Sequence, residues 1–409
     1  MERSATHAAR RTSRVTPSRA SSVLLLLGVL LIAANLRPTL LSVGPLLPMI
    51  RASEGLSASG AGVLNALPLV AFAGTSILVP RAGRRLGIER ALLVALVVLA
   101  VGTVLRSLPS LGALFGGTVV LCVGIAGANV LLPSLIKRDF PARVSVMTAF
   151  YGATMTIVSA VAAGVAVPLA SVLPGGWRGS LACWVVLTAV AIAVWAVAAT
   201  RVPGRTASVG ATSPVGIPWR SALAWQVTVF MGLQAFAFYV LVGWLPTLLH
   251  SYGMSDERAG LMLLLSQGVS VVTYLLSPLA IRRFSDQRFV AAATALLQAG
   301  GWLGLMLAPG LAVVWVVVLG VALSVSMVLA LSFFSLRAAD PHGAAALSGM
   351  GQSLGYLLAA AGPAIFGVLG EVTGGWTVPL VIVTAIAVGL ATTGLFAGRD
   401  RQVTGDQPS

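Results

Sequence analysis

Long apolar stretches separated by short polar segments recur along this 409-residue chain, from residue 22 to residue 397. Each stretch is long enough to form a helix that crosses a hydrocarbon core of about 30 Å, at about 1.5 Å per residue. The twelve predicted helices cover residues 22–48, 58–80, 90–107, 111–136, 145–172, 178–200, 221–249, 257–281, 288–308, 312–335, 343–370 and 376–397. This pattern predicts an all-α membrane protein with twelve transmembrane helices.

The second half of the pattern repeats the first at a nearly constant spacing. Eight residues recur 198 positions later, where Pro48, Gly55, Ser57, Ala61, Gly62, Pro80, Arg84 and Arg85 correspond to Pro246, Gly253, Ser255, Ala259, Gly260, Pro278, Arg282 and Arg283. Further along, Pro141 pairs with Pro341, and Gly175-Gly176-Trp177 pairs with Gly374-Gly375-Trp376. A parallel repeat of two six-helix units is typical of transporters whose substrate lies between the halves near mid-membrane.

The repeat divides the chain into two halves, residues 22–200 and residues 221–397. Between them, residues 201–220 are rich in proline, glycine and polar side chains, which is typical of a linker. Residues 1–21 form a polar, arginine-rich tail that we expect to be disordered, and residues 398–409 form a second tail.

Composition and charge support a chain that is embedded in lipid. Hydrophobic residues make up 57% and charged residues 9%, whereas soluble proteins carry about 25% charged residues. The net charge of +15 comes from Lys and Arg placed mainly in the tails and alternate loops, and the other loops hold only Arg51, Arg106, Arg178 and Arg258. This alternation follows the positive-inside rule and predicts an inner-membrane protein with both termini in the cytoplasm. Nucleic-acid binding is disfavoured because the basic loops carry few aromatic residues.

Two motifs connect this pattern to a known family. The first predicted helix contains Ala33-Ala34-Asn35-Leu36-Arg37-Pro38 and then Ser42-Val43-Gly44-Pro45, and the loop after the second contains Arg84-Arg85-Leu86-Gly87-Ile88-Glu89-Arg90. Twelve helices in a six-plus-six repeat resemble the major facilitator superfamily, and the motifs resemble its cyanate/2-nitroimidazole transporter family. The resemblance implies a monomeric secondary carrier that works by alternating access. Its cargo would be a cyanate-like anion or a nitroimidazole-like heterocycle.

The loop after the second helix departs from the superfamily pattern, in which an acidic residue precedes the basic ones. Aligned on Gly87, the acidic position is Arg84, and its repeat is Arg282, so the usual charge relay cannot operate in its standard form. The antiporter signature of the fifth helix is also incomplete around Gly164 and Pro168, which weakens antiport without excluding it. Gating or structural roles are expected for Pro38, Arg84, Arg85, Gly87, Arg282 and Arg283.

Arg37 is the one Lys or Arg that lies away from the tails, loops and helix ends, about 14 residues and so about 21 Å from the start of its predicted helix. A buried arginine costs about 2.5–3.5 kcal/mol on the insertion scale, and the acidic residues all map to tails, loops or helix ends. Because a guanidinium is a planar fork of donors that suits an oxyanion, Arg37 is predicted to be the main substrate contact. Two alternatives are snorkelling to the outer surface and bracing of the helix through main-chain carbonyls such as that of Ala34, which Pro38 leaves free. Pro38 also predicts a bend.

Polar side chains at membrane depth are further candidates for substrate contact. Gln267 shares a face of the eighth helix with Ser270 and Tyr274, at spacings of three and four residues. The alternative for each candidate is a hydrogen bond between helices. The predicted set, besides Arg37, consists of Asn129, Gln234, Gln267, Gln352 and Tyr356.

The sequence contains no phosphate-binding glycine loop, no metal-ligating cluster and no catalytic triad. We therefore expect a carrier that is not an enzyme and needs no cofactor or metal. Its expected partners are the lipid bilayer and a small anionic solute. Without an intramembrane carboxylate as a relay, coupling is left open between a proton carried by the solute, exchange for another anion, and passive transport. Two other functions remain, an exporter of neutral amphipathic drugs and a non-transporting membrane sensor, which would need a soluble signalling region.

Overall fold

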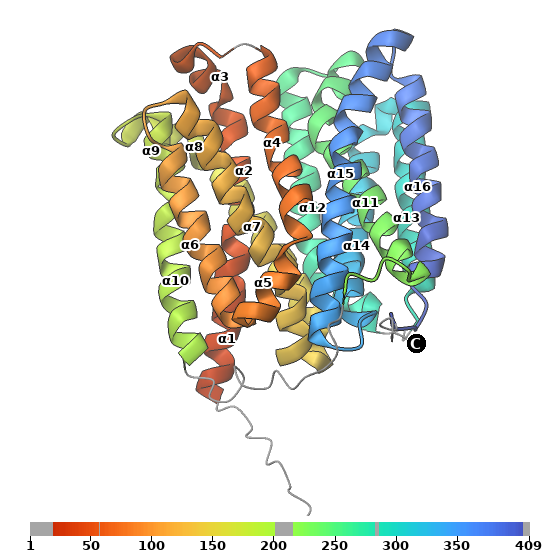
Figure 1. Ribbon diagram of the computed structural model, residues 1–409. Coiled ribbons are helices and arrows are strands. Elements are labelled where there is room, and N and C mark those ends of the chain that lie inside the picture. The colour runs from red at the N-terminus through yellow and green to blue at the C-terminus, as the bar shows by residue number, and fades with distance from the viewer. Residues whose placement is uncertain (1–18, 57, 201–215, 283–285, 404–409) are drawn as a thin grey trace, which may run out of the picture.

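The computed structural model describes residues 19–56, 58–200, 216–282 and 286–403. Long helices lie side by side and run between two ends of the molecule (Figure 1). The first helix, α1 (Arg19–Asn35), begins at the end where the last, α16 (Thr377–Ala397), finishes. We call this end the terminal side and the opposite end the far side. Most of the predicted linker and tails, at residues 1–18, 201–215 and 404–409, lies outside the described residues.

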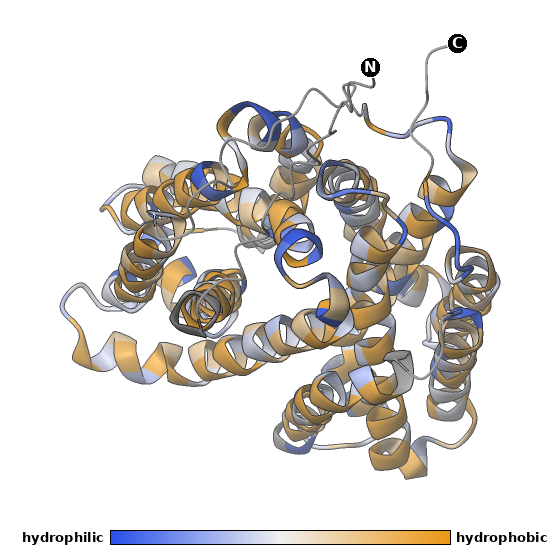
Figure 2. Cartoon of the chain, turned by 90° about the horizontal axis from the view of Figure 1, so that it is seen from below, coloured by the Kyte–Doolittle hydropathy of each residue, from blue (hydrophilic) through white to orange (hydrophobic). Residues whose placement is uncertain are grey.

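The two halves contain equivalent sets of spans. The first half consists of α1, α2 (Pro38–Leu41), α3 (Val43–Glu54), α4 (Ala58–Ser76), α5 (Val79–Leu86), α6 (Ile88–Arg106), α7 (Leu111–Asp139), α8 (Val144–Val172), α9 (Trp177–Ala182) and α10 (Trp184–Thr200). The second consists of α11 (Ala222–Ser251), α12 (Asp256–Arg282), α13 (Arg288–Leu307), α14 (Ala312–Leu336), α15 (Pro341–Thr373) and α16. Within the described residues, eleven spans are long and apolar enough to cross a membrane, and α4 with α5 takes the place of the second predicted helix. Viewed from below, the ribbon is mainly hydrophobic, and its strongly hydrophilic positions lie at loops and helix ends (Figure 2).

Three of the predicted helices are not continuous. The first, predicted over residues 22–48, ends as α1 at Asn35 and resumes as α2 and then α3. The second is divided between α4 and α5, and the sixth between α9 and α10. Pro38 and Pro80 stand at the first or second position of α2 and α5, where a missing N–H is tolerated. These prolines therefore begin new helices rather than bend existing ones.

Glycines let α6 and α7 approach each other closely. A methyl group added at Gly117 of α7 would lie 2.1 Å from the main-chain nitrogen of Arg106. One added at Gly102 of α6 would lie 2.2 Å from the main-chain nitrogen of Leu121. Contact this close leaves no room for a side chain, so these glycines set the distance between the two helices.

We expect Gly117→Ala to lower the melting temperature of the purified protein, because the added methyl group must displace backbone rather than a flexible side chain. Overpacking of this kind costs about 1–3 kcal/mol. The neighbouring Gly116 is a matched control, since nothing lies within 4 Å of a methyl group built there. Gly116→Ala should leave the melting temperature unchanged or raise it slightly, because alanine favours a helix. Equal melting temperatures in the two variants would contradict the close-packing interpretation.

Two arginines that the charge pattern assigns to loops are buried instead. Arg106 is the last residue of α6 and is 0% exposed. Arg337 directly follows α14 and is 2% exposed. A position at a helix end or in a loop does not leave either side chain in water, because a long arginine side chain can bury its stem and bond to main-chain oxygens nearby.

In each half an arginine fastens the end of the fourth span to the start of the third. In the first half, Arg138 at the end of α7 makes an ion pair of 2.6 Å with Glu89 at the start of α6. In the second, Arg337 after α14 bonds to the side-chain oxygen of Gln287, which precedes α13, and to two main-chain carbonyls at the end of α16. Glu89 and Gln287 are 198 positions apart, and the two arginines 199. The repeat found in the sequence therefore extends to these contacts.

Candidate functional site

A narrow cavity of about 10 Å³, room for about one water molecule, lies between the two halves. Its lining comes from both of them and consists of Arg37, Thr156, Phe238, Gln267, Ser270, Tyr274, Leu323 and Ser324. Thr156 stands 12 residues after the start of α8 and 16 before its end, and Phe238 is similarly central in α11. Both positions are roughly 20 Å from either end of their helices. The cavity therefore lies at mid-depth of the spans.

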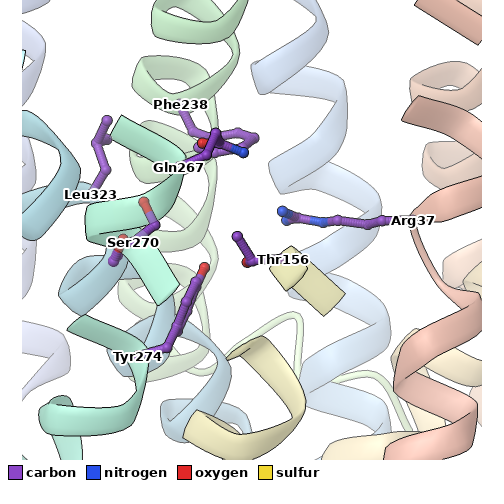
Figure 3. A pocket seen from close by; sticks show the side chains of 8 residues that line it. Arg37, Thr156, Phe238, Gln267, Ser270, Tyr274 and Leu323 are labelled. Carbon is purple, nitrogen blue, oxygen red and sulfur yellow. The ribbon is translucent and has the colours of Figure 1, made fainter. Parts of the chain in front are cut away.

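The interruption of the first span places Arg37 at this cavity. The α1 helix ends at Asn35, the main-chain N–H of Leu36 donates to the carbonyl of Ala33 at 3.1 Å, and Arg37 precedes Pro38 at the start of α2. The side chain of Arg37 extends from the first half toward the residues that the second half contributes from the opposite side (Figure 3). The break in the helix thus directs a cation into the space between the halves.

The guanidinium of Arg37 is half-buried and makes no hydrogen bond or ion pair with any described residue. Its central carbon lies 5.2 Å from the centroid of the Phe238 ring, within the range of a cation–π contact. Four phenol groups also interact with it electrostatically, those of Tyr151, Tyr239, Tyr274 and Tyr356. Aromatic faces and neutral hydroxyls therefore surround a positive charge that has no described negative partner.

The interrupted first span is braced by a different arginine. Nη1 of Arg106 donates a hydrogen bond of 2.6 Å to the main-chain oxygen of Thr39, in α2. Within the described chain, the other two nitrogens of this guanidinium and the hydroxyls of Thr39 and Ser42 are buried without a hydrogen-bond partner. Arg106 thus holds α2 from α6, while Arg37 donates no bond to a main-chain oxygen in that part of the chain.

The structure distributes the other predicted contacts over different places. Gln267 lines the cavity. Tyr356 interacts electrostatically with the arginine there, and its ring lies 5.4 Å from that of Phe72 in the other half. Gln234 is buried and donates to the main-chain oxygen of Leu323 at 3.3 Å, so it supports a residue of the lining instead of forming part of it.

Gln352 and Asn129 meet at the contact between the halves. The side-chain nitrogen of Gln352, on α15, donates to the main-chain oxygen of Asn129, on α7, at 3.1 Å and to the hydroxyl of Ser348 at 2.8 Å. Both residues are buried and lie outside the lining of the cavity. Their arrangement is the hydrogen bond between helices that the sequence left open as the alternative.

A series of hydrogen bonds joins the halves near the terminal side. Lys137 donates to the carbonyl of Ser335 at 2.8 Å, Ser134 donates to the carbonyl of Pro341 at 2.6 Å, and the hydroxyl of Ser335 donates to the carbonyl of Pro133 at 2.8 Å. We call these contacts the terminal seam. Two further hydrogen bonds link the halves, from Gln352 to the main-chain oxygen of Asn129 and from Ser353 to that of Ala73. This conformation is therefore closed on the terminal side.

The residues expected to gate or shape the loops lie near the ends of helices. Arg84 and Arg85 are at the end of α5, where Arg84 is half-buried and Arg85 is exposed. Gly87 links α5 to α6 with φ 81°, in the region that favours glycine. Arg282 ends α12, but its side chain lies outside the described part, and so does the whole of Arg283.

Sequence reasoning missed Tyr151, Tyr239 and Thr156. A signal was present, because the chain has five tyrosines and four of them lie in apolar segments. Period and composition do not show that these four, from four different helices and both halves, interact with one arginine.

Two related six-span halves with a shared cavity at mid-depth are the architecture of a membrane transporter. Residues 23–363 match the profile of the Major Facilitator Superfamily, and the chain belongs to this family. It is 42% identical over 394 residues to the 2-nitroimidazole transporter of Escherichia coli (strain K12), covering 96% of this chain and 100% of that one. It is also 29% identical over 368 residues to the cyanate transport protein CynX of the same organism, covering 90% and 95%.

Solved structures give the same fold. The proton:xylose symporter XylE bound to 6-bromo-6-deoxy-D-glucose matches with a TM-score of 0.74 and 15% identity, covering 93% of this chain and 96% of that one. The superfamily and the fold class that the sequence predicts are confirmed, as is the resemblance to the cyanate and nitroimidazole transporters.

Proposed function

We propose that this protein is a secondary carrier that moves a small anionic or strongly polar solute across the inner membrane by alternating access. Arg37 is its main electrostatic contact. The observation that supports this most directly is a guanidinium that faces the cavity between the halves without a hydrogen bond or ion pair to a described residue. A solute with a carboxylate, a nitro group or a similar pair of acceptor oxygens matches the planar fork of donors on Arg37.

The lining favours a planar ring over a linear ion. Phe238 presents a ring face to the cavity, and the Phe72–Tyr356 pair adds further aromatic surface nearby. Aromatic side chains of this kind stack on flat solutes, and Gln267 and Tyr274 supply polar atoms that can orient one. Among the relatives named above, the nitroimidazole transporter has the cargo of this shape. A bare cation in the cavity disfavours neutral amphipathic drugs, which offer it no acceptor.

The direction of opening follows from the charge pattern. The positive-inside rule places the terminal side in the cytoplasm, and the terminal seam closes that side here. The conformation described is thus outward-facing or occluded in the proposed topology, with a single chain as the working unit.

A thermal-shift measurement tests the role of Arg37. We expect 2-nitroimidazole, benzoate or cyanate to raise the melting temperature of the parent protein, and Arg37→Ala to abolish that increase. A ligand at 100 times its Kd stabilises the folded state by about 2.7 kcal/mol. Arg51→Ala is the matched control, because Arg51 lies on α3 of the same span and is exposed. Stabilisation that persists unchanged in Arg37→Ala would refute the proposed contact.

A further inference from the structure

We infer that this carrier is an anion exchanger, which changes its open side rapidly only with an anion bound and so moves one anion in for each anion out. The inference rests on the proposed function and adds to it the mode of transport. It also names the coupling partner, which is a second anion on the other side of the membrane.

The empty site is positively charged. Arginine stays protonated in proteins, so the empty cavity carries a full positive charge at Arg37. Among the described side chains, no carboxylate lines the cavity or pairs with this residue. Asp256 and Glu257 begin α12 ten residues or more before Gln267, which is about 15 Å along the helix.

The groups next to Arg37 do not compensate its charge. The ring of Phe238 and the neighbouring phenol groups are electrically neutral. Neutral groups can attract the guanidinium, but they do not cancel its charge. Arg37 is half-buried, lines the cavity and donates no hydrogen bond to a described residue. Its N–H groups can therefore bind a solute that enters the cavity.

The charge of the empty site opposes the change of conformation. Arg37 belongs to the first half, whereas Phe238, Tyr239, Tyr274 and Tyr356 belong to the second. Rocking the halves past each other requires an occluded state in which the cavity is closed on both sides and its water is reduced. An unpaired guanidinium opposes that state because a buried charge without a partner is strongly unfavourable. A bound anion supplies both the opposite charge and the acceptor oxygens, so the loaded carrier passes through it.

A carrier with this barrier exchanges one anion for another. The empty carrier is slow to return, and the fastest route back is to bind an anion on the side where the first was released. The exchange of two monoanions moves no net charge. This mode depends on charge balance in the cavity and not on a particular bend of α8, so the incomplete glycine–proline signature there does not oppose it.

The test compares exchange with net uptake in proteoliposomes of the full-length protein, with the membrane potential held at zero by potassium and valinomycin. Labelled benzoate, 2-nitroimidazole and cyanate are the probes, and uptake into protein-free vesicles is subtracted. We expect uptake to be at least tenfold faster into vesicles preloaded with the same unlabelled solute than into empty ones. Arg37→Gln should remove this acceleration, and Arg51→Gln, on the same span, should keep it.

Three outcomes of this test would overturn three different claims. Equal protein-dependent rates into empty and preloaded vesicles would overturn exchange but leave the carrier function standing. Acceleration that survives in Arg37→Gln would overturn the role of the arginine in it. No protein-dependent uptake of any of the three probes under either condition would overturn the proposed function itself.

Discussion

Gly349→Leu is expected to reduce transport at least tenfold while leaving the protein folded. Gly349 lies on α15, where a methyl group added to it would be 2.8 Å from the carbonyl oxygen of Ser76 and 2.7 Å from the ring of Pro80. Those two residues belong to the first half, so a leucine side chain would act as a wedge between the halves on the terminal side. Closure there is required in every transport cycle, and the variant should rest with that side open.

The measurement combines transport rate with the side from which the cavity can be labelled. In a background without Cys122 and Cys183, Ser270→Cys places a thiol in the lining of the cavity. Thiol reagents should reach it from the terminal side in Gly349→Leu and from the far side in the parent. Gly300→Leu is the control, because Gly300 is exposed on α13 with nothing within 4 Å of an added methyl group. Unchanged transport, or labelling from the same side in all three proteins, would contradict the wedge.

Arg106→Met is expected to reduce transport about tenfold or more with little loss of thermal stability. The guanidinium of Arg106 bonds to the carbonyl of Thr39, two residues after Arg37, and thereby holds the short α2 helix. Its removal leaves that carbonyl unpaired, at a cost of about 1–3 kcal/mol if buried. It also removes a buried cation with two nitrogens that lack described partners. These opposite terms nearly offset in stability, but Arg37 loses its support.

Melting temperatures and initial transport rates of Arg106→Met, Arg106→Lys and Arg51→Met separate positioning from folding. Arg106→Lys keeps one charged donor for the carbonyl of Thr39 and should retain most of the transport. Arg51→Met, exposed on the same span, should behave as the parent. A parallel fall of stability and transport in Arg106→Met, with no recovery in Arg106→Lys, would show that the residue serves folding alone.

The spans could be predicted closely from the sequence because lipid imposes a simple rule on length and polarity. The helices predicted over residues 145–172 and 312–335 are α8, from Val144 to Val172, and α14, from Ala312 to Leu336. The breaks in the first, second and sixth spans were not predicted. Apolar residues lie on both sides of the first and sixth breaks, so hydropathy does not mark them, and Pro38 predicted only a bend. At the second break the chain passes into α5, which contains three arginines and so resembles a loop in sequence.

The chemistry of the site could be predicted only in part. Arg37 stands out because a charge inside an apolar helix is rare, and the structure places it in the cavity. Amide side chains do not stand out in this way. Gln267 lines the cavity, whereas Gln352 bonds to another helix, because an amide is satisfied equally by a solute or by a neighbouring carbonyl. Which of the two occurs depends on which face of a helix meets its neighbour, and this is a property of packing between segments far apart in the chain.

The contacts of Arg138 and Arg337 at the terminal side show how the two halves can differ. In one copy the arginine meets the carboxylate of Glu89, and in the other it meets the amide of Gln287 and nearby carbonyls. The duplicated unit therefore needs an acceptor oxygen at this place, and an anion there is optional. An ionised acceptor makes the stronger bond. A single substitution of the acceptor in one half could therefore strengthen or weaken this contact without changing the other half. A difference at this one acceptor is thus a simple means by which two similar halves can favour one of the two open forms.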